Sequence, residues 1–252
     1  MAAWQLAWAG HGYSRRVIAR KGAWQACHVT SKGFVDLEIH VTVERRILIL
    51  GAGGHAKVVI DIVETAELGT IVGILDDDSR KHGAQVLGYT VLGGRDALNG
   101  LLADRPLYGL AAIGDNRIRK DAVDWFVRSG GRLLNAIHSR ACVARSAKIG
   151  GGSVVMAGAV INPDATIGSN VIVNTGSIVE HDCMVGDHAH LAPSSVLCGG
   201  VEIGEGAFIG VGAKIVPGVQ VGNWAIVGAG ATVLAAIPVG AVAVGVPARL
   251  LR

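Results

Sequence analysis

The sequence lacks the features that mark membrane proteins, nucleic-acid-binding proteins and disulfide-rich secreted proteins. No run of apolar residues approaches the roughly 18 that a membrane-spanning helix needs. The net charge is only +3 over 252 residues and is spread along the chain, so no basic surface for nucleic acid is indicated. The 4 cysteines show no CxxC spacing, and we interpret them as reduced thiols of a cytoplasmic protein.

Aromatic residues are also scarce, at 4%, whereas glycine is abundant, with 37 residues. This composition suits a glycine-turned repeat protein better than a domain with an aromatic core. From Val143 to Val239 every sixth residue is Val, Ile or Leu, without interruption. A period of six fits neither a helix nor a two-faced strand, so we predict a parallel β-helix in which each hexad forms one flat side.

A second track of residues supports the β-helix. The position four residues after each aliphatic is nearly always small, as at Ala159, Ser177 and Cys183. We expect both tracks to point into a narrow triangular interior. Glycine often follows the aliphatic residue directly, as at Gly186 and Gly204, where we expect it to ease the turn at a corner. Three hexads close one coil, so residues 18 apart in the sequence should stack about 4.8 Å apart.

Residues 46–139 follow the pattern of a small Rossmann-like βαβ domain. A strand over 47–50 precedes a glycine turn, a helix to about residue 68, and a strand over 71–75 that ends in acidic residues. A further strand over 107–113 precedes a helix through residue 127. Gly51, Gly53 and Ala56 fit the G-x-G-x-x-A pattern of dinucleotide enzymes, but any ligand with a phosphate, or a turn without a ligand, fits it too. The domain is half the usual size, which argues against a dehydrogenase.

Residues 1–45 differ from the rest of the chain and show no sustained period. They lack the leading basic cluster of a signal peptide. We interpret them as an N-terminal extension that is non-native or disordered, with a pairing segment packed on the next domain as the alternative. The β-helix domain then occupies residues 140–252.

Four motifs together resemble a known family. They are the turn Gly51-Ala-Gly-Gly-His-Ala-Lys57, the acidic loop Asp76 to Asp78, the segment Ile113-Gly-Asp-Asn-Arg-Ile-Arg119, and the hexapeptide repeat. This combination is similar to the sialic acid O-acetyltransferases and bacillosamine-pathway sugar acetyltransferases among the hexapeptide-repeat acyltransferases. The resemblance implies a left-handed β-helix, a homotrimer, acetyl-CoA as co-substrate and a nucleotide-linked amino sugar as acceptor.

The resemblance also implies which residues of the small domain bind the substrate. The glycine turn and its basic residues would meet the sugar or the diphosphate, and the acidic loop would accept hydrogen bonds from the nucleoside. The substrate-binding residues predicted in this way are Gly53, Gly54, His55, Lys57, Asp76, Asp77 and Asn116.

Acetyl transfer needs a base for the proton of the attacking group and a donor for the developing oxyanion. His181 follows an inward aliphatic by two positions, so it should lie near an outward corner, and Glu180 or Asp182 could orient it. The resemblance points to the same histidine, at the end of the motif that begins at Asn174, and we count Asn174 among the predicted catalytic residues. Gly199 lies 18 residues after His181, so its N–H is the predicted oxyanion donor one coil away.

Further residues are assigned to the cofactor. His190 lies nine residues from His181 and on another side of the prism, so the two could meet only across a subunit boundary. In a trimer, His190 would contact acetyl-CoA or the sugar from the neighbouring chain. The resemblance implies that Lys214, Pro247 and Arg249 bind coenzyme A near its 3′-phosphate.

The leading hypothesis is therefore an acetyl-CoA-dependent N-acetyltransferase acting on a UDP-4-amino-sugar type of substrate, with no metal. Nothing in these residues separates an amine from a hydroxyl acceptor, so an O-acetyltransferase of sialic acid is the alternative. The cluster of His181, His188 and His190 keeps open a zinc carbonic-anhydrase-like β-helix. A non-catalytic nucleotide-sugar-binding protein is the third possibility.

Overall fold

The computed structural model describes residues 16–18, 24–29, 35–38, 45–102 and 106–251. The chain divides into two compact units, residues 1–44 and 45–252. The interpretation of residues 1–45 as non-native or disordered falls largely outside the described residues and stays a prediction. In the first unit three strands form an antiparallel sheet, namely β1 (Arg16–Ile18), β2 (Trp24–Val29) and β3 (Val35–Glu38).

The second unit opens with a six-stranded sheet in the order β6-β7-β5-β4-β8-β9. In its central strand, β4 (Arg46–Leu50), the residues Ile47, Leu48 and Ile49 are fully buried, because a parallel sheet covered on both faces needs consecutive apolar residues. Its neighbours β5 and β8 both run parallel to it. The strands are β4 (Arg46–Leu50), β5 (Thr70–Leu75), β6 (Gln85–Val86), β7 (Tyr89–Gly93), β8 (Leu107–Ala111) and β9 (Arg132–Leu133).

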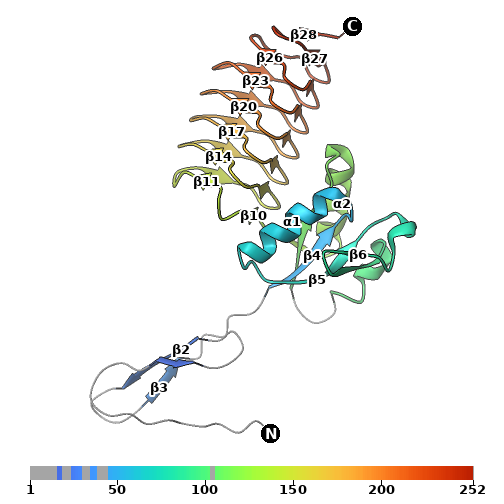
Figure 1. Ribbon diagram of the computed structural model, residues 1–252, viewed down its shortest axis with the longest axis vertical. Helices are drawn as coiled ribbons and strands as arrows, with labels where there is room; N and C mark the ends of the chain where they lie inside the picture. Colours follow the sequence, from blue (N-terminus) through green and yellow to red (C-terminus); the bar gives the residue numbers. More distant parts are fainter. Residues whose placement is uncertain (1–15, 19–23, 30–34, 39–44, 103–105, 252) are drawn as a thin grey trace. The chain divides into compact units, whose positions relative to one another are not determined.

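Two α-helices and two short 3-10 helices complete this domain: α1 (Gly54–Thr65), η1 (Ser79–Lys81), η2 (Arg95–Leu98) and α2 (Asn116–Arg128). Helix α1 buries one apolar face that includes Val59 and Val63. These residues share one core with Met156 and Ile172, which face outward from the β-helix. Helix α1 therefore lies between the sheet and the β-helix (Figure 1) and joins the two domains.

The β-helix contains three parallel sheets, one for each side of the prism. Consecutive coils pair with the predicted 18-residue register, as in Val155 with Val173 and Val179 with Leu197. The first side comprises β10 (Ala136–Ile137), β13 (Val154–Val155), β16 (Ile172–Val173), β19 (His190–Leu191), β22 (Phe208–Ile209), β25 (Ile226–Val227), β27 (Val242–Val244) and the antiparallel β28 (Arg249–Leu250).

The other two sides are built in the same way. The second comprises β11 (Cys142–Val143), β14 (Val160–Ile161), β17 (Ile178–Val179), β20 (Val196–Leu197), β23 (Lys214–Ile215) and β26 (Thr232–Val233). The third comprises β12 (Lys148–Ile149), β15 (Thr166–Ile167), β18 (Met184–Val185), β21 (Glu202–Ile203) and β24 (Gln220–Val221).

Both predicted interior tracks are buried. The aliphatic residues from Val155 to Val233 are at most 3% exposed, and the small residues Ala159, Ser177 and Cys183 are fully buried. The predicted fold class, a small Rossmann-like domain followed by a parallel β-helix of hexapeptide repeats, is confirmed. None of the helices in the described ranges is long and apolar enough to cross a membrane.

The role predicted for the corner glycines is wrong in its reason. The backbone adopts a left-handed conformation three residues after each aliphatic from Ile149 to Val227, as at Asp182, where φ is 60°. The glycines that directly follow the aliphatics are needed for space. A Cβ atom on Gly186 would lie 2.6 Å from the backbone nitrogen of Glu205 in the next coil.

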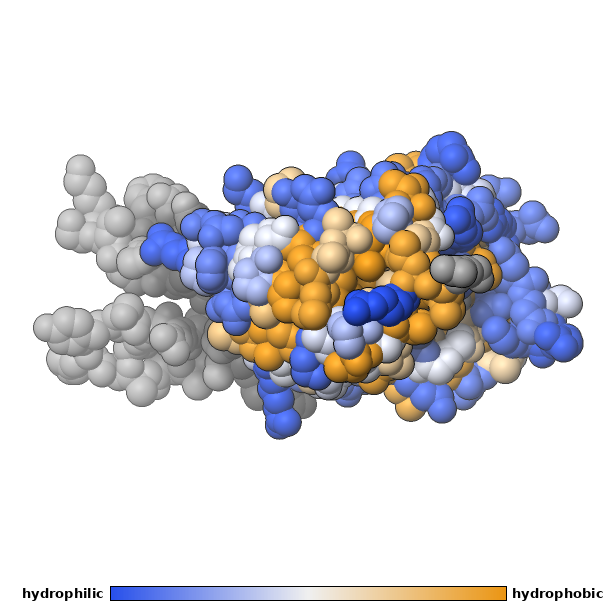
Figure 2. All heavy atoms as spheres, turned by 90° about the horizontal axis from the view of Figure 1, so that it is seen from above, coloured by the Kyte–Doolittle hydropathy of each residue, from blue (hydrophilic) through white to orange (hydrophobic). Residues whose placement is uncertain are grey.

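The prediction that Val239 points inward is also wrong. Val221 forms its bridge with Ile237, 16 residues on, so the last coil is shorter than the others. Ile237 is 7% exposed and takes the interior position, whereas Val239 is 71% exposed. Figure 2 views the end of the β-helix where the chain finishes in Figure 1, and apolar side chains gather there because no further coil covers them.

Candidate active site

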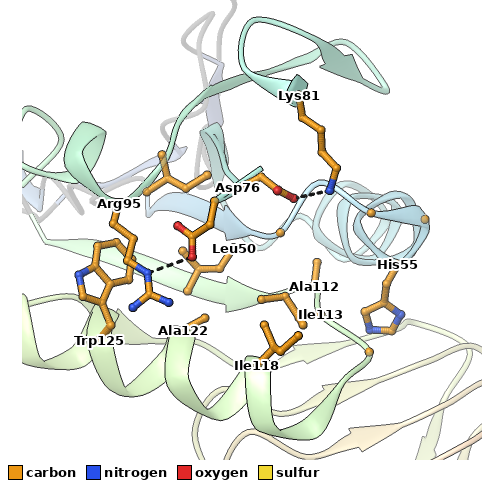
Figure 3. Close-up of a pocket in the computed structure, with 16 residues that line it drawn as sticks. Leu50, His55, Asp76, Lys81, Arg95, Ala112, Ile113, Ile118, Ala122 and Trp125 are labelled. Atoms are coloured by element: carbon orange, nitrogen blue, oxygen red, sulfur yellow. Dashed lines mark hydrogen bonds and ion pairs between the residues drawn. The ribbon is translucent and has the colours of Figure 1, made fainter. Parts of the chain in front are cut away.

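A cavity of about 430 Å³ lies at the carboxyl ends of β4, β5 and β8. Ligands of open parallel sheets bind at this edge. Its walls are mostly apolar and come from the strand ends and from α2. The residues that line it are Leu50, Gly51, Gly53, Gly54, His55, Leu75, Asp76, Asp77, Lys81, Arg95, Ala112, Ile113, Gly114, Ile118, Ala122 and Trp125. Figure 3 shows His55 and Lys81 at one end, and Arg95 with Trp125 at the other.

The glycine turn bounds the first end of the cavity. Gly51 has a φ of 101°, and a Cβ atom there would lie 2.7 Å from the side chain of Ile113. The turn is held by Asp76, whose Oδ2 accepts hydrogen bonds from the N–H of Ala52 at 2.7 Å and from Lys81 Nζ at 2.9 Å. Partial burial opposes the charge of Asp76, but these bonds hold its pKa below the ordinary value. Asp76 therefore shapes the turn, and both of its carboxylate oxygens already have protein partners.

His55 lies on the same end, in the first turn of α1. Its Nε2 is buried and has no hydrogen-bond partner within the described part of the chain. Burial, assisted by the nearby positive charge of Arg119, lowers the pKa of His55 to about 4. A neutral imidazole at a cavity wall, with one nitrogen unsatisfied, can accept a hydrogen bond from a ligand or donate one to it.

His181 lies on the corner that follows β17, with 63% of its side chain exposed. Its Nδ1 lies 2.7 Å from Asp182 Oδ2. Since a carboxylate accepts, Nδ1 carries the proton and the lone pair of Nε2 is free to act as a base. The hydrogen bond to Asp182 raises the pKa of His181, and the charge of Glu180 adds to this effect. Of the two orienting carboxylates that the sequence left open, Asp182 is the one that bonds the ring.

Gly199 stacks directly over the imidazole, as the 18-residue rule predicts. A Cβ atom on Gly199 would lie 2.7 Å from Cε1 and 2.8 Å from Nε2 of His181. The next N–H, that of Gly200, donates to the His181 carbonyl at 3.0 Å. Across the described residues, no group accepts a hydrogen bond from the Gly199 N–H.

His190 lies in a different environment from the one its predicted role requires. It is 7% exposed, and its ring packs edge-on against Phe208 at 5.1 Å. Nδ1 donates to the carbonyl of Gly114 at 3.2 Å, and Nε2 accepts from Asn174 Nδ2 at 3.1 Å. Burial lowers its pKa to about 4, assisted by Arg119. Both nitrogens are thus occupied within the chain, and the cofactor contact predicted for His190 stays a prediction.

Asn116 and Arg119 join the two domains instead of lining the cavity. Arg119 is 1% exposed and donates to the carbonyls of Asn170, His188 and Gly114, while burial lowers its pKa to about 10. Asn116 donates to the carbonyl of Gly206 at 3.0 Å. The segment from Ile113 to Arg119 therefore provides contacts to the β-helix.

The remaining predicted residues lie apart from the cavity. Lys57 is exposed on α1. Lys214 is exposed and donates to the nearby carbonyl of Gly212, and Pro247 and Arg249 lie in the last turn before β28 and in β28 itself. His188 is held by Asn170 at 2.8 Å. Within the described ranges, no three His, Cys, Asp or Glu side chains converge as metal ligands.

Sequence reasoning did not assign several residues that line the cavity, among them Lys81, Arg95, Ile118 and Trp125. For the last two a signal exists. Ile118, Ala122 and Trp125 recur at helical spacing, so they form one stripe of α2 that faces the cavity. Arg95 and Lys81 lie in the short 3-10 helices η2 and η1, which follow β7 and β5, and no periodicity predicts where such short segments fold.

The comparisons with known proteins match both domains. Residues 46–126 match the family model of the PglD N-terminal domain. Residues 164–199 and 200–235 match the bacterial transferase hexapeptide family, with six repeats. UDP-N-acetylbacillosamine N-acetyltransferase from Bacillus subtilis is 37% identical over 114 residues, covering 45% of this chain and 52% of that protein. The match thus spans about half the length of this curated relative.

Solved structures are similar over nearly their whole length. PerB from Caulobacter crescentus, in complex with CoA and GDP-perosamine, is 44% identical with a TM-score of 0.77, covering 82% of this chain and 97% of PerB. The acetyltransferase domain of PglB from Neisseria gonorrhoeae, in complex with acetyl coenzyme A, is 38% identical with a TM-score of 0.76. That match covers 82% of this chain and 100% of the domain.

Proposed function

The chain belongs to the hexapeptide-repeat sugar acetyltransferases with a PglD-type N-terminal domain, and on that basis we propose that it acetylates the amino group of a nucleotide-diphosphate-linked sugar. The acetyl donor is acetyl-CoA. The observation that carries the proposal is the pair of His181 and Asp182, with Nδ1 bonded at 2.7 Å and Nε2 beneath Gly199 without a partner in the described part of the chain.

The chemistry follows from that geometry. The neutral amine attacks the thioester carbon, a C–N bond forms, and Nε2 of His181 takes the proton that the nitrogen loses. Asp182 stabilises the resulting imidazolium. The N–H of Gly199 donates to the oxyanion of the tetrahedral intermediate. The C–S bond then breaks, and the departing thiolate of CoA takes the proton back from His181.

The cavity of the small domain holds the nucleotide. The glycine turn and the N-terminus of α1 present backbone N–H groups to the diphosphate. Lys81 supplies positive charge nearby, and His55 Nε2, which is buried without a partner among the described residues, bonds the diphosphate or the sugar. Asn174 acts through His190, which it bonds at 3.1 Å, as a positioning residue.

The reaction needs a second copy of the chain. His181 is exposed at a corner, outside the nucleotide cavity, so a neighbouring subunit must complete the cleft. The outward residues Val160, Ile178 and Val196 form an apolar, half-buried row on the second side of the β-helix. This row supports a homotrimer packed along that side, with Lys214, Pro247 and Arg249 contributing to the acetyl-CoA site, and His190, bonded to Gly114 and Asn174, supporting that site from within the chain. The free thiols of Cys142, Cys183 and Cys198 fit a cytoplasmic location.

The test is a thiol-release assay with acetyl-CoA against GDP-perosamine, a UDP-linked 4-amino sugar, and free sialic acid. We expect release with an amino sugar and its loss in His181→Ala. Release only with sialic acid would establish O-acetylation and contradict the proposal. Retained nucleotide-sugar binding without release from any acceptor would favour a binding protein.

A further inference from the structure

Arg95 is fixed at the end of the cavity opposite the glycine turn (Figure 3). Its Nε lies 3.1 Å from Asp77 Oδ2, and its Nη2 lies 2.5 Å from Asp121 Oδ2. Its guanidinium carbon lies 5.1 Å from the centre of the Trp125 ring. These partners come from the loop after β5 and from α2. The guanidinium is therefore oriented before any ligand arrives, which lowers the entropy cost of binding.

This arrangement leaves donors and acceptors side by side. A guanidinium has five N–H donors, and the two ion pairs use one on Nε and one of the two on Nη2. In the described part of the chain, Nη1 of Arg95 has no partner. Each carboxylate also keeps one oxygen outside its ion pair, and Asp77 is 64% exposed and Asp121 61%. The free guanidinium edge is thus flanked by carboxylate oxygens that can accept further bonds.

The ends of the cavity differ in chemistry. The glycine turn, with His55 and Lys81, suits a diphosphate, and the stripe Ile118 and Ala122 offers an apolar wall for a flat ring. A nucleotide that places its diphosphate at the turn therefore extends its base toward Arg95.

We propose that Arg95 reads the edge of the base and that this cavity selects guanosine diphosphate sugars. Guanine presents the acceptors O6 and N7 to an arginine, and its N1–H and 2-amino donors can bind a carboxylate. Uracil has a single N–H donor between two carbonyls, so it satisfies fewer of these groups. The inference rests on the proposed function for the presence of a nucleotide, and it names the class that the cavity takes.

Calorimetric titration of the full chain with GDP, IDP and UDP tests the inference. We expect GDP to bind about tenfold to a hundredfold more tightly than UDP. IDP, which lacks the 2-amino group, should bind with intermediate affinity. Arg95→Met should remove the preference while acetyl-CoA binding and the melting temperature stay unchanged. Arg128→Met, on the exposed end of α2, is the matched control and should keep the preference.

Equal or tighter binding of UDP would overturn the inference, and so would a preference for GDP that survives Arg95→Met. Acetyl transfer to a UDP-linked sugar without any GDP preference would overturn it while leaving the proposed function intact. GDP binding that depends on Arg95, without acetyl transfer to any amino sugar, would support it and count against the proposed function alone.

Discussion

Replacing Gly199 with alanine should disable the enzyme without unfolding it. The added Cβ would lie 2.7 Å from Cε1 of His181, and ordinary contacts begin at 3.4 Å, so the ring must move by about 0.7 Å. Gly199 does not occupy the left-handed region, so alanine adds no backbone strain there. It also keeps the backbone N–H. A displacement of a catalytic group by close to 1 Å can cost about a hundredfold in rate.

The assay is the initial rate of thiol release across acetyl-CoA and acceptor concentrations, together with a thermal melt. We expect kcat to fall by roughly a hundredfold while the melting temperature changes little, because His181 is exposed and free to swing away. Gly151→Ala is the matched control. Its nearest neighbour would be Leu133 Cβ at an ordinary 3.8 Å, and it lies on another corner.

A Gly199→Ala variant with wild-type kcat would refute the reasoning, since the imidazole could not then be the base in the orientation described. A large fall in the melting temperature would instead mean that the corner is part of the folded core, which the exposure of His181 argues against.

Three further predictions follow from charges and burial. Asp182→Asn should lower the pKa of His181, because the hydrogen bond that raises it is lost. The acidic limb of the pH profile of kcat/KM should therefore move to lower pH. A limb that stays at the same pH would exclude Asp182 as the group that orients His181. The pKa values of His55 and His190 are about 4 in the folded protein, whereas an ordinary histidine has a pKa of 6.5. The unfolded chain therefore binds more protons between these two values, so the free energy of unfolding should fall on acidification. In urea unfolding, the free energy of unfolding should fall by roughly 2 kcal/mol per histidine from pH 7 to pH 5. The total loss should be about half as large in His190→Gln as in the wild type, and a free energy of unfolding that does not change with pH would contradict the prediction. Arg119→Met should leave several buried carbonyls unpaired and lower the free energy of unfolding by roughly 3 kcal/mol. A loss below about 1 kcal/mol in urea unfolding would show that the contact between the small domain and the β-helix does not depend on Arg119.

The β-helix could be predicted almost residue by residue, because every coil repeats the same steric problem. Branched aliphatics and small residues must alternate inside a narrow prism, so both classes recur at a fixed spacing in the sequence. The exception is the last coil, where Val239 keeps the period but the chain is two residues short, so Ile237 fills the interior. A periodic pattern cannot reveal a shortened coil when aliphatic residues stand both at the periodic position and two residues before it.

The candidate site was only partly predictable. His181 and Gly199 could be placed because stacking across coils relates sequence distance to space. Arg95 could not, because its partners Asp77 and Asp121 come from separate elements that only the folded loops bring together. Asn116 bonds the carbonyl of Gly206 where the two domains meet, and its predicted contact with the substrate stays a prediction, because a motif alone does not say which surface it faces.

The most direct test of the central claim is a single-turnover reaction of acetyl-CoA with a nucleotide-linked amino sugar, in which the product is identified by mass spectrometry and NMR. Wild-type protein and His181→Asn would be compared at equal nucleotide-sugar occupancy. We predict one new amide on the sugar nitrogen with the wild type and none with His181→Asn on the same timescale. An ester product, or an amide formed equally fast by His181→Asn, would contradict the account.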